Sequence, residues 1–477
     1  MTIAIPQLPA GWTFVDKHYV RPTVGTEFDM ARLNRLCDGQ FNFCFGFTLN
    51  TDIPNLPEAV VEALVRVRFS APLIAASIEP LAGSPDNFQW VYAPMKSKDD
   101  ALAWARATLI VHETTSTDEQ VINSITDIRL PYHIGDRREQ VFACHLILRP
   151  NGEHALFMHG SHAVLDARPT MHTLRHLFHV IVHHDDEPCL DQLPYGGEVA
   201  SLPVDIIQLL GKDLLEAAKT SGIRLPEQLN KNLPSIGLAP QRNDITAPAL
   251  RACVGATINT DKLRSVLSAL KAIGFSFTLL CDAAIALTTI KRNCNLDADW
   301  QYIHDNTIIA LQRYFPSGYS EERHIASSMA YVPLVLSPQS INMDSPLCDQ
   351  LVEVMSALRK EYTDYFSQPA LPFANIVART ELRSLPLNPH RPFFTNIGVI
   401  DKFVPSMWVG GNNDKLHLEL GELKFGHRII NMRCPVMHAW TFRDVFHLQI
   451  QFLDVYDMEY LQSLLDEIIT TMLGIVN

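Results

Sequence analysis

The stretch VFACHLILRPNGEHALFMHGSHAVLDARP, residues 141–169, decides the fold of this chain. Residues 141–159 hold two alternating apolar segments joined by Pro150-Asn151-Gly152, which is the strongest short hairpin signal in the sequence. The second segment ends at Gly160, and residues 161–184 then predict a turn followed by an amphipathic helix. We therefore expect a β-hairpin whose second strand runs directly into a helix.

His162 and Asp166 lie where this strand gives way to the helix. A histidine at a strand end is held rigidly and can face a cleft, where it can act as a general base. The His-x-x-x-Asp spacing alone means little, because about one chance match is expected in a chain with 19 histidines. The strand, the turn and the helix around it support the interpretation. The alternative is a histidine that is only part of the core.

The rest of the first half alternates strand and helix. Residues 41–50 and 88–95 alternate as strands do. Residues 56–72 predict an amphipathic helix that Pro72 ends, and residues 97–113 predict a second helix with an acidic start.

A segment rich in proline and glycine, residues 185–248, separates the two halves, with a short helical patch inside it. Its composition favours an extended crossing over compact packing. We place the N-terminal lobe at residues 1–200, a crossover connector at 201–248 and the C-terminal lobe at 249–477.

The second half repeats this alternation with different residues. Strands are predicted at 250–260, 307–315, 327–336, 393–401, 416–427 and 444–453, and helices at 260–274, 276–293, 346–366 and 458–473. Two halves that each mix strands and helices predict an α/β (α+β) protein, with a mixed sheet flanked by helices in each lobe.

The composition excludes several classes of protein. The 477 residues are 47% hydrophobic, which is enough for two sizeable cores, and the net charge is −13 (39 − 52), which argues against a nucleic-acid or anionic-membrane partner. No apolar run is long enough to span a bilayer, and no leader is evident. The nine scattered cysteines read as reduced thiols, so we expect a cytoplasmic protein.

At this point the sequence resembles the chloramphenicol acetyltransferase-like superfamily, the HxxxD acyltransferases. Its members include peptide-synthetase condensation domains, plant BAHD acyltransferases and fungal trichothecene O-acetyltransferases. The resemblance covers most of the chain. It rests on His162 and Asp166, FNFCFGFTLN (41–50), the helix SFTLLCDAAIALTTI (276–290), HIASSMAYVPLVL (324–336) and FFTNIGVID (393–401).

The resemblance implies two lobes with a tunnel between them, entered by an acyl thioester from one side and by an acceptor from the other. His162 would be the general base. Asp166 would turn away from it and pair with an arginine that holds the loop, for which we name Arg313.

Two further groups of residues are assigned under this interpretation. Thr395 and Asn396 are the candidates for stabilising the oxyanion of the tetrahedral intermediate, although a plain strand-end turn explains them equally well. Lys402, Lys424 and Arg428 are the candidates for holding the phosphates of coenzyme A, and solvated surface charge is the alternative for each.

The chain departs from the family pattern in three places. Ser161 stands where several branches have a first histidine, and Ala167 replaces a glycine after the aspartate. The plant-type DFGWG sequence is absent, with ELKFGHR (422–428) nearest to it. This absence argues against the plant branch and favours a fungal-type or stand-alone condensation-like enzyme.

Four histidines, His172, His176, His179 and His183, share one face of the helix after the motif. No HExxH glutamate or complete ligand set accompanies them, so we expect a packed helix face and no metal. Nucleotide-binding glycine motifs and G-x-S-x-G are also absent.

The sequence thus predicts a CoA-dependent O-acyltransferase of specialised metabolism that acylates a hydroxyl of a hydrophobic small molecule. No permanently bound cofactor is expected; acyl-CoA is a co-substrate, and the protein is expected to be a monomer. Three alternatives stay open. They are amide or ester formation from an acyl group on a carrier protein, cyclisation or isomerisation without acyl transfer, and a non-catalytic binding scaffold.

Overall fold

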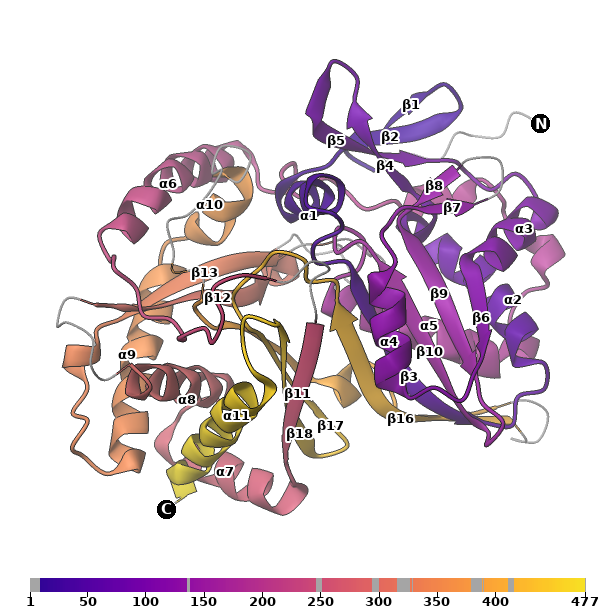
Figure 1. Ribbon diagram of the computed structural model, residues 1–477. Coiled ribbons are helices and arrows are strands. Elements are labelled where there is room, and N and C mark those ends of the chain that lie inside the picture. The colour runs from indigo at the N-terminus through magenta and orange to yellow at the C-terminus, as the bar shows by residue number, and fades with distance from the viewer. Residues whose placement is uncertain are drawn as a thin grey trace. The chain divides into compact units, whose positions relative to one another are not determined.

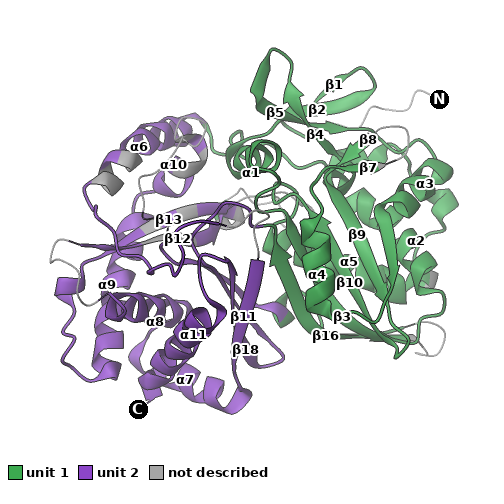
Figure 2. Cartoon of the chain, viewed as in Figure 1, with its two compact units in different colours: residues 1–211, 312–328, 401–428 green, residues 212–311, 329–400, 429–477 purple. Residues whose placement is uncertain are grey.

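The chain divides into two compact units, each assembled from separate stretches of sequence. The computed structural model describes residues 9–134, 138–245, 251–293, 300–314, 327, 329–378, 388, 390–410 and 416–476. Unit 1 contains residues 1–211, 312–328 and 401–428, and unit 2 contains residues 212–311, 329–400 and 429–477 (Figure 2).

Unit 1 is built around a six-stranded mixed sheet with the strand order β15-β16-β3-β10-β9-β6. The strands are β3 (Phe43–Thr51), β6 (Leu109–Glu113), β9 (Phe142–Leu148), β10 (Glu153–Gly160), β15 (Met407–Gly410) and β16 (Leu416–His427). The predicted hairpin is confirmed as β9 and β10, which pair antiparallel on either side of the turn at Gly152. The expected strand at 41–50 is β3.

The neighbour of β3 on its other side is β16, which comes from far along the chain. Its register joins His427 to Phe43 and Lys424 to Gly46, and the difference in colour between the two strands is visible in Figure 1. Residues 401–428 therefore belong to unit 1, whereas the sequence placed them in a contiguous C-terminal lobe at 249–477. Periodicity cannot reveal this pairing, because it reports the type of an element and not its partner.

Helices cover both faces of the six-stranded sheet (Figure 1). One face carries α4 (Asp118–Asp127), whose apolar side chains form one buried cluster with β3, β9 and β10. The other face carries α5 (Ala167–Val182), where Phe178 contacts Phe47 edge-on, and α2 (Leu56–Ser70) packs beside α5. Alternate residues of β3 thus serve two separate cores.

A second sheet in unit 1 has the order β1-β2-β5-β4 and packs against α1 (Gly25–Leu36). Its strands are β1 (Thr13–Val15), β2 (His18–Pro22), β4 (Ser77–Leu81) and β5 (Ser84–Tyr92). The fully buried ion pair between Arg21 and Glu27, at 2.8 Å, links β2 to α1, and the Trp90 indole donates to the same carboxylate at 3.1 Å. The remaining elements of unit 1 include α3 (Lys98–Thr108), β7 (Tyr132–Ile134) and β8 (Arg138–Gln140).

Unit 2 contains the four-stranded sheet β11-β18-β17-β14 and the hairpin of β12 and β13. Its elements are α6 (Lys212–Asn230), β11 (Arg251–Ile258), α7 (Thr260–Ile273), α8 (Phe277–Lys291), β12 (Tyr302–Ala310), β13 (Met329–Leu336), α9 (Leu347–Phe366), α10 (Leu371–Ala378), β14 (Phe393–Val399), β17 (Val436–Phe442), β18 (Val445–Leu453) and α11 (Met458–Leu473). The predicted buried helix is α8, which is buried from Leu279 to Ile290. The mixed α/β class is thereby confirmed.

The structure differs from the sequence interpretation in three segments. The helix expected over 97–113 ends at Thr108, because the β-branched residues that follow form β6 and pair parallel with β9. The strand expected over 307–315 is already complete at Ala310. The connector holds the 19-residue helix α6, which packs against α10 in place of an extended crossing.

Two expectations about the whole chain can be compared with the structure. No single helix among the described residues is long and apolar enough to cross a membrane; α7 and α8 reach the required length only as a pair bent by 100°. Eight cysteines lie in the described part of the chain, and all eight are free thiols.

Four titratable side chains form a hydrogen-bonded chain on the α4 face of the sheet. His112 on the edge strand β6 contacts His145 (Nε2 to Nδ1, 3.0 Å), His145 contacts the Tyr132 hydroxyl at 2.9 Å, and that hydroxyl contacts Nδ1 of His159. His145 and His159 are completely buried. Burial lowers the pKa of His145 well below 6.5, and burial together with the charge of Arg428 lowers the pKa of His159 to about 3.

These two histidines should make the protein less stable in acid. In the folded state both rings are neutral, whereas in the unfolded chain they bind protons below a pH of about 6.5. The free energy of unfolding should therefore decrease as the pH falls from 6.5 toward 3, with each ring contributing up to about 1.4 kcal/mol per pH unit. In His159→Gln, urea unfolding between pH 6 and pH 4 should show a slope smaller by about one proton. An unchanged slope would contradict the neutral buried state of His159.

Gly46 should be intolerant of a side chain. A Cβ atom there would lie 1.9 Å from the carbonyl oxygen of Leu156 on β10, so the backbone of β3 or β10 would have to move. Gly46→Ala should lower the free energy of unfolding by roughly 1–3 kcal/mol, measured by urea denaturation. Gly255→Ala is the control, because its Cβ would have only Leu448 O nearby, at 3.8 Å. Equal effects of the two substitutions would contradict this account of β3.

Candidate functional site

The candidate site begins with the turn that follows β10. The amide of Ser161 donates to Val141 O at 2.9 Å, and the Ser161 carbonyl accepts from the amides of Val164 and Leu165 at 2.9 and 3.0 Å. A Cβ atom on Gly160 would lie 3.0 Å from both Leu165 Cδ1 and Val141 O. The glycine thus lets the turn fold back onto its own strand, which fixes the backbone of His162.

A distant segment holds the same turn within unit 1. The amide of Ser327 donates to Ala163 O at 3.1 Å, and the hydroxyl of Thr26, at the start of α1, donates to Ser327 O at 3.2 Å. Ser327 is completely buried. The sequence offered no signal for this contact, because single backbone hydrogen bonds between segments far apart leave no pattern.

Asp166 is the N-cap of α5. Its backbone is extended, and its Oδ1 accepts the amide of Ala167 at 2.7 Å, so the carboxylate stabilises the first turn of the helix. Ala167 is the first helical residue and does not have a positive φ. The replacement of the family's glycine by alanine therefore causes no strain here.

The imidazole of His162 lies in a stack of rings. It is stacked with Phe43 of β3 at a centroid distance of 5.4 Å and with His427 of β16 at 5.9 Å, at interplanar angles of 17° and 26°. Phe43 and His427 also contact each other at 4.8 Å. The sequence analysis identified neither residue. The alternation of 416–427 indicated a strand, but nothing in it indicated pairing with β3.

The surroundings of His162 favour its neutral form. Burial lowers the pKa of the imidazole, and the charge of Asp166 and the nearby carbonyl groups of His162 and Leu165 only partly oppose this effect. The Nδ1 atom is buried and makes no hydrogen bond of normal geometry. The residue as a whole is half-buried.

Thr395 and Asn396 lie in unit 2, on β14. The Asn396 side chain accepts the amide of Gly398 at 2.9 Å and donates to the Thr278 hydroxyl at 3.1 Å. It thereby holds a β-bulge at which Gly398 has φ 96°. These contacts support the alternative, in which the two residues form a structural turn. The oxyanion role of Thr395 and Asn396 stays a prediction.

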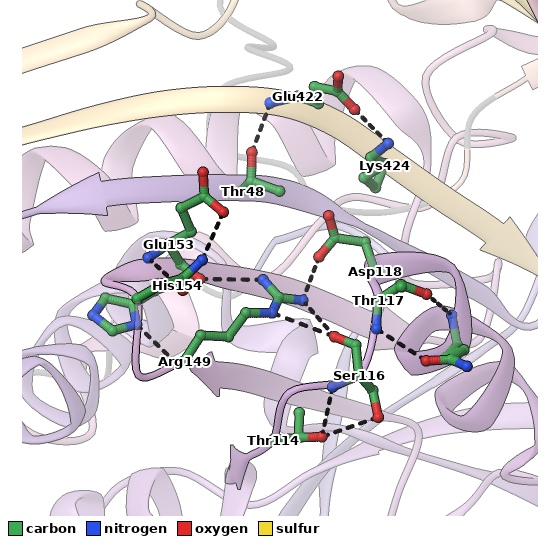
Figure 3. Close-up of polar contacts among 12 residues, drawn as sticks. Thr48, Thr114, Ser116, Thr117, Asp118, Arg149, Glu153, His154, Glu422 and Lys424 are labelled. Carbon is green, nitrogen blue, oxygen red and sulfur yellow. Dashed lines mark hydrogen bonds and ion pairs between the residues drawn. The ribbon is translucent and has the colours of Figure 1, made fainter.

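The three basic residues assigned to coenzyme A lie in unit 1 and have different surroundings. Lys402 is exposed. Lys424 pairs with Glu422, whose amide donates to the hydroxyl of Thr48 on β3 at 2.7 Å (Figure 3). Arg428 bonds Asp38 Oδ2 at 2.8 Å and several backbone carbonyls, so it fastens the loop before β3 to the end of β16.

Figure 3 also shows how the hairpin of β9 and β10 is tied to α4. Arg149 bonds Asp118 Oδ1 at 2.6 Å, and its guanidinium approaches Ser116 O at 3.4 Å. Thr117 and Gln120 form a capping box at the start of the same helix. The strand that leads to His162 is therefore anchored at its far end as well.

Two other predictions concern the motif and the helix after it. The side chain of Arg313 lies outside the described residues, so its pairing with Asp166 stays a prediction. The four histidines of α5 have separate contacts. His172 meets Phe403 edge-on, His176 bonds the Ser70 hydroxyl at 3.0 Å, and His179 and His183 stack at 4.4 Å.

Comparison with known proteins gives no match by sequence and several by fold. No family model matches the chain, and no curated protein matches it. Among solved structures, it is similar to a trichothecene 15-O-acetyltransferase from Fusarium sporotrichioides, with 18% identity, a TM-score of 0.80 and coverage of 100% of both chains.

Two further structures are similar over nearly their whole length. The first condensation domain of the calcium-dependent antibiotic synthetase gives 11% identity, a TM-score of 0.66 and 95% coverage of each chain. The epimerization domain of the third module of tyrocidine synthetase B gives 13% identity, a TM-score of 0.59 and 92% coverage of each chain. The chain therefore has the chloramphenicol acetyltransferase-like fold that acyltransferases and condensation domains share.

Proposed function

We propose that this protein is an acyltransferase that moves an acyl group from a thioester, acyl-CoA, to a hydroxyl of a hydrophobic small molecule in specialised metabolism. His162 is the general base. The observation that carries the proposal is the surroundings of its imidazole, which is held in a ring stack, is half-buried and has its pKa lowered by burial. The similarity in fold to an acetyltransferase over the whole chain supports it.

The chemistry follows from that imidazole. An alcohol is a poor nucleophile at neutral pH, so Nε2 accepts its proton while the oxygen attacks the thioester carbonyl. The tetrahedral intermediate then collapses, the carbon–sulfur bond breaks, and the imidazolium returns the proton to the leaving thiolate. A single base serves both steps and ends the cycle neutral. A base whose pKa lies below 6.5 is unprotonated at pH 7 and ready for the first step.

Asp166 supports the base from a distance. Its contact with the Ala167 amide uses the carboxylate to cap α5, and its charge favours the imidazolium that forms during the reaction. In the proposed site Arg313 pairs with this carboxylate. A cap of this kind fixes the helix that begins directly after the His162 turn.

The residues proposed for the donor and the oxyanion differ in the contacts that they already make. Lys402 is exposed and forms no ion pair among the described residues, which makes it the most available cation for a phosphate of coenzyme A. Lys424 and Arg428 already have carboxylate partners. The amide of Asn396 is engaged within unit 2, so the Thr395 hydroxyl is the better oxyanion donor of the pair.

A donor screen tests the reaction class. The purified protein is incubated with an extract of the source organism and either acyl-CoA thioesters of increasing length or the same acyl groups on a carrier protein. The proposal expects products heavier by one acyl unit, with release of free coenzyme A thiol. Turnover with carrier-bound donors alone would identify the condensation-like alternative. The same fold occurs in an epimerization domain, and a product of unchanged mass would identify a reaction without acyl transfer.

His162→Ala should reduce kcat at least about a hundredfold, which is the usual scale for a lost general base. His18→Ala, on an exposed strand of the second sheet, is the matched control and should leave the rate unchanged. The measurement is thiol release under saturating donor. Full turnover by the His162→Ala protein would remove the assignment of His162 as the general base.

The pH profile gives a second test of the base. Because burial lowers the pKa of His162, kcat/KM should decrease in acid with an apparent pKa below 6.5. An acid limb centred clearly above 6.5 would contradict a desolvated neutral base.

His427 should act as a positioning residue through its stack on His162. His427→Ala removes the ring that covers one face of the imidazole, so it should lower kcat roughly tenfold and move the acid limb of the profile up toward 6.5. His427→Phe keeps an aromatic ring and should restore both values. If the alanine and phenylalanine variants behave alike, or if KM changes while kcat and the profile do not, stacking is not the role of His427.

A further inference from the structure

A small cavity in unit 1 lies apart from the HxxxD motif, between α2 and the end of α5. It has a volume of about 200 Å³, and its lining includes Glu58, Glu62, Arg66, Val180 and His184. Val180 is 14 residues along the chain from Asp166, which places the cavity about 20 Å down α5 from the motif. At about 30 Å³ per water molecule, this volume equals roughly seven waters. That is room for a molecule of amino-acid size.

Arg66 is the unusual group in this cavity. The residue is 7% exposed, and its Nε and Nη1 atoms are buried without a hydrogen-bond partner. A buried charge without partners is unfavourable, and proteins rarely keep one that has no use.

Arg68, two positions along the same helix, shows the contrast. It is 3% exposed, donates to the Tyr92 hydroxyl at 3.1 Å and to Ala93 O at 2.7 Å, and lies over the Trp104 ring. The same helix therefore satisfies one buried arginine and leaves two nitrogen atoms of the other, which lines the cavity, without a partner.

A carboxylate of the same helix completes the site. Glu62 precedes Arg66 by one helical turn and lines the cavity with it, yet no ion pair joins the two among the described residues. Glu58, one turn earlier, also lines the cavity and pairs with Arg106 at 2.7 Å. Besides this paired carboxylate and His184, the cavity offers one cationic donor group, Arg66, and one anionic acceptor group, Glu62.

We propose that this cavity binds a small zwitterion of the α-amino acid class, independently of acyl transfer. The ligand carboxylate accepts hydrogen bonds from the Arg66 guanidinium, and the ligand ammonium donates to Glu62. Desolvation of both charges inside the cavity favours a ligand that carries both partners. A simple anion would meet Glu62, and a simple cation would meet Arg66.

Binding to the full chain is measured by calorimetry and by thermal unfolding with L-alanine, glycine, acetate and ethylammonium. Saturable binding of the two amino acids, at least tenfold tighter than that of acetate or ethylammonium, is expected. Equal or tighter binding of acetate would identify an anion site and overturn the zwitterion assignment. The absence of saturable binding by either amino acid would overturn the proposal as a whole.

Two substitutions localise the site. Arg66→Met should abolish amino-acid binding while leaving the Tm of the ligand-free protein unchanged or higher, because it removes an unsatisfied buried charge. Arg68→Met is the matched control and should lower the Tm, because it removes satisfied contacts. A decrease in Tm for Arg66→Met as large as that for Arg68→Met would show that Arg66 is structural and would refute its role in binding.

Glu62→Gln is a second test of where the ligand binds, and it leaves the buried charge of Arg66 in place. It should weaken L-alanine binding at least tenfold and leave acetate binding unchanged or stronger. Unchanged L-alanine affinity in this variant would show that Glu62 does not contact the ligand. It would also contradict the assignment of a zwitterion as the ligand.

Discussion

The pairing of β16 with β3 is the constraint on which the candidate site depends. It brings His427 opposite Phe43, so that the imidazole of His162 lies against two rings from strands almost 400 residues apart. The Arg428 guanidinium then closes the end of this ladder by bonding Asp38 and nearby carbonyl groups. Without β16, the edge of β3 would expose unpaired backbone groups and one face of the imidazole would lose its cover.

Desolvation gives two different results on the two faces of this sheet. On the α4 face, His145 and His159 are completely buried in a hydrogen-bonded chain, so their neutral state is a matter of stability. On the other face, His162 is only half-buried. The same physical effect there lowers the pKa of an imidazole whose Nδ1 atom is buried without a partner, and a neutral ring at pH 7 is what the proposed general base requires.

Four arginines of unit 1 have different roles because their side chains make different contacts. Arg21 and Arg68 are buried and bond neighbouring elements, Arg21 through the Glu27 carboxylate and Arg68 through the Tyr92 hydroxyl, so they contribute to packing between elements. Arg428, assigned from sequence to a coenzyme, has its donors engaged by the protein itself. Arg66 is as buried as these but faces a cavity. Only three-dimensional surroundings separate these cases, because all four are single basic residues in or directly after ordinary strands or helices.

The sequence by itself determined the hairpin of β9 and β10, the helix after it, the position of His162 and Asp166 between them, and the mixed α/β class. These features depend on local periodicity, turn residues and caps, which are properties of neighbouring residues. The tertiary structure alone decided that residues 401–428 join unit 1, that Phe43, His427 and Ser327 surround the HxxxD turn, and that α6 forms inside the connector. Such contacts join segments hundreds of residues apart, and the free energy that selects them comes from burial and strand pairing across the whole chain, which no local pattern records.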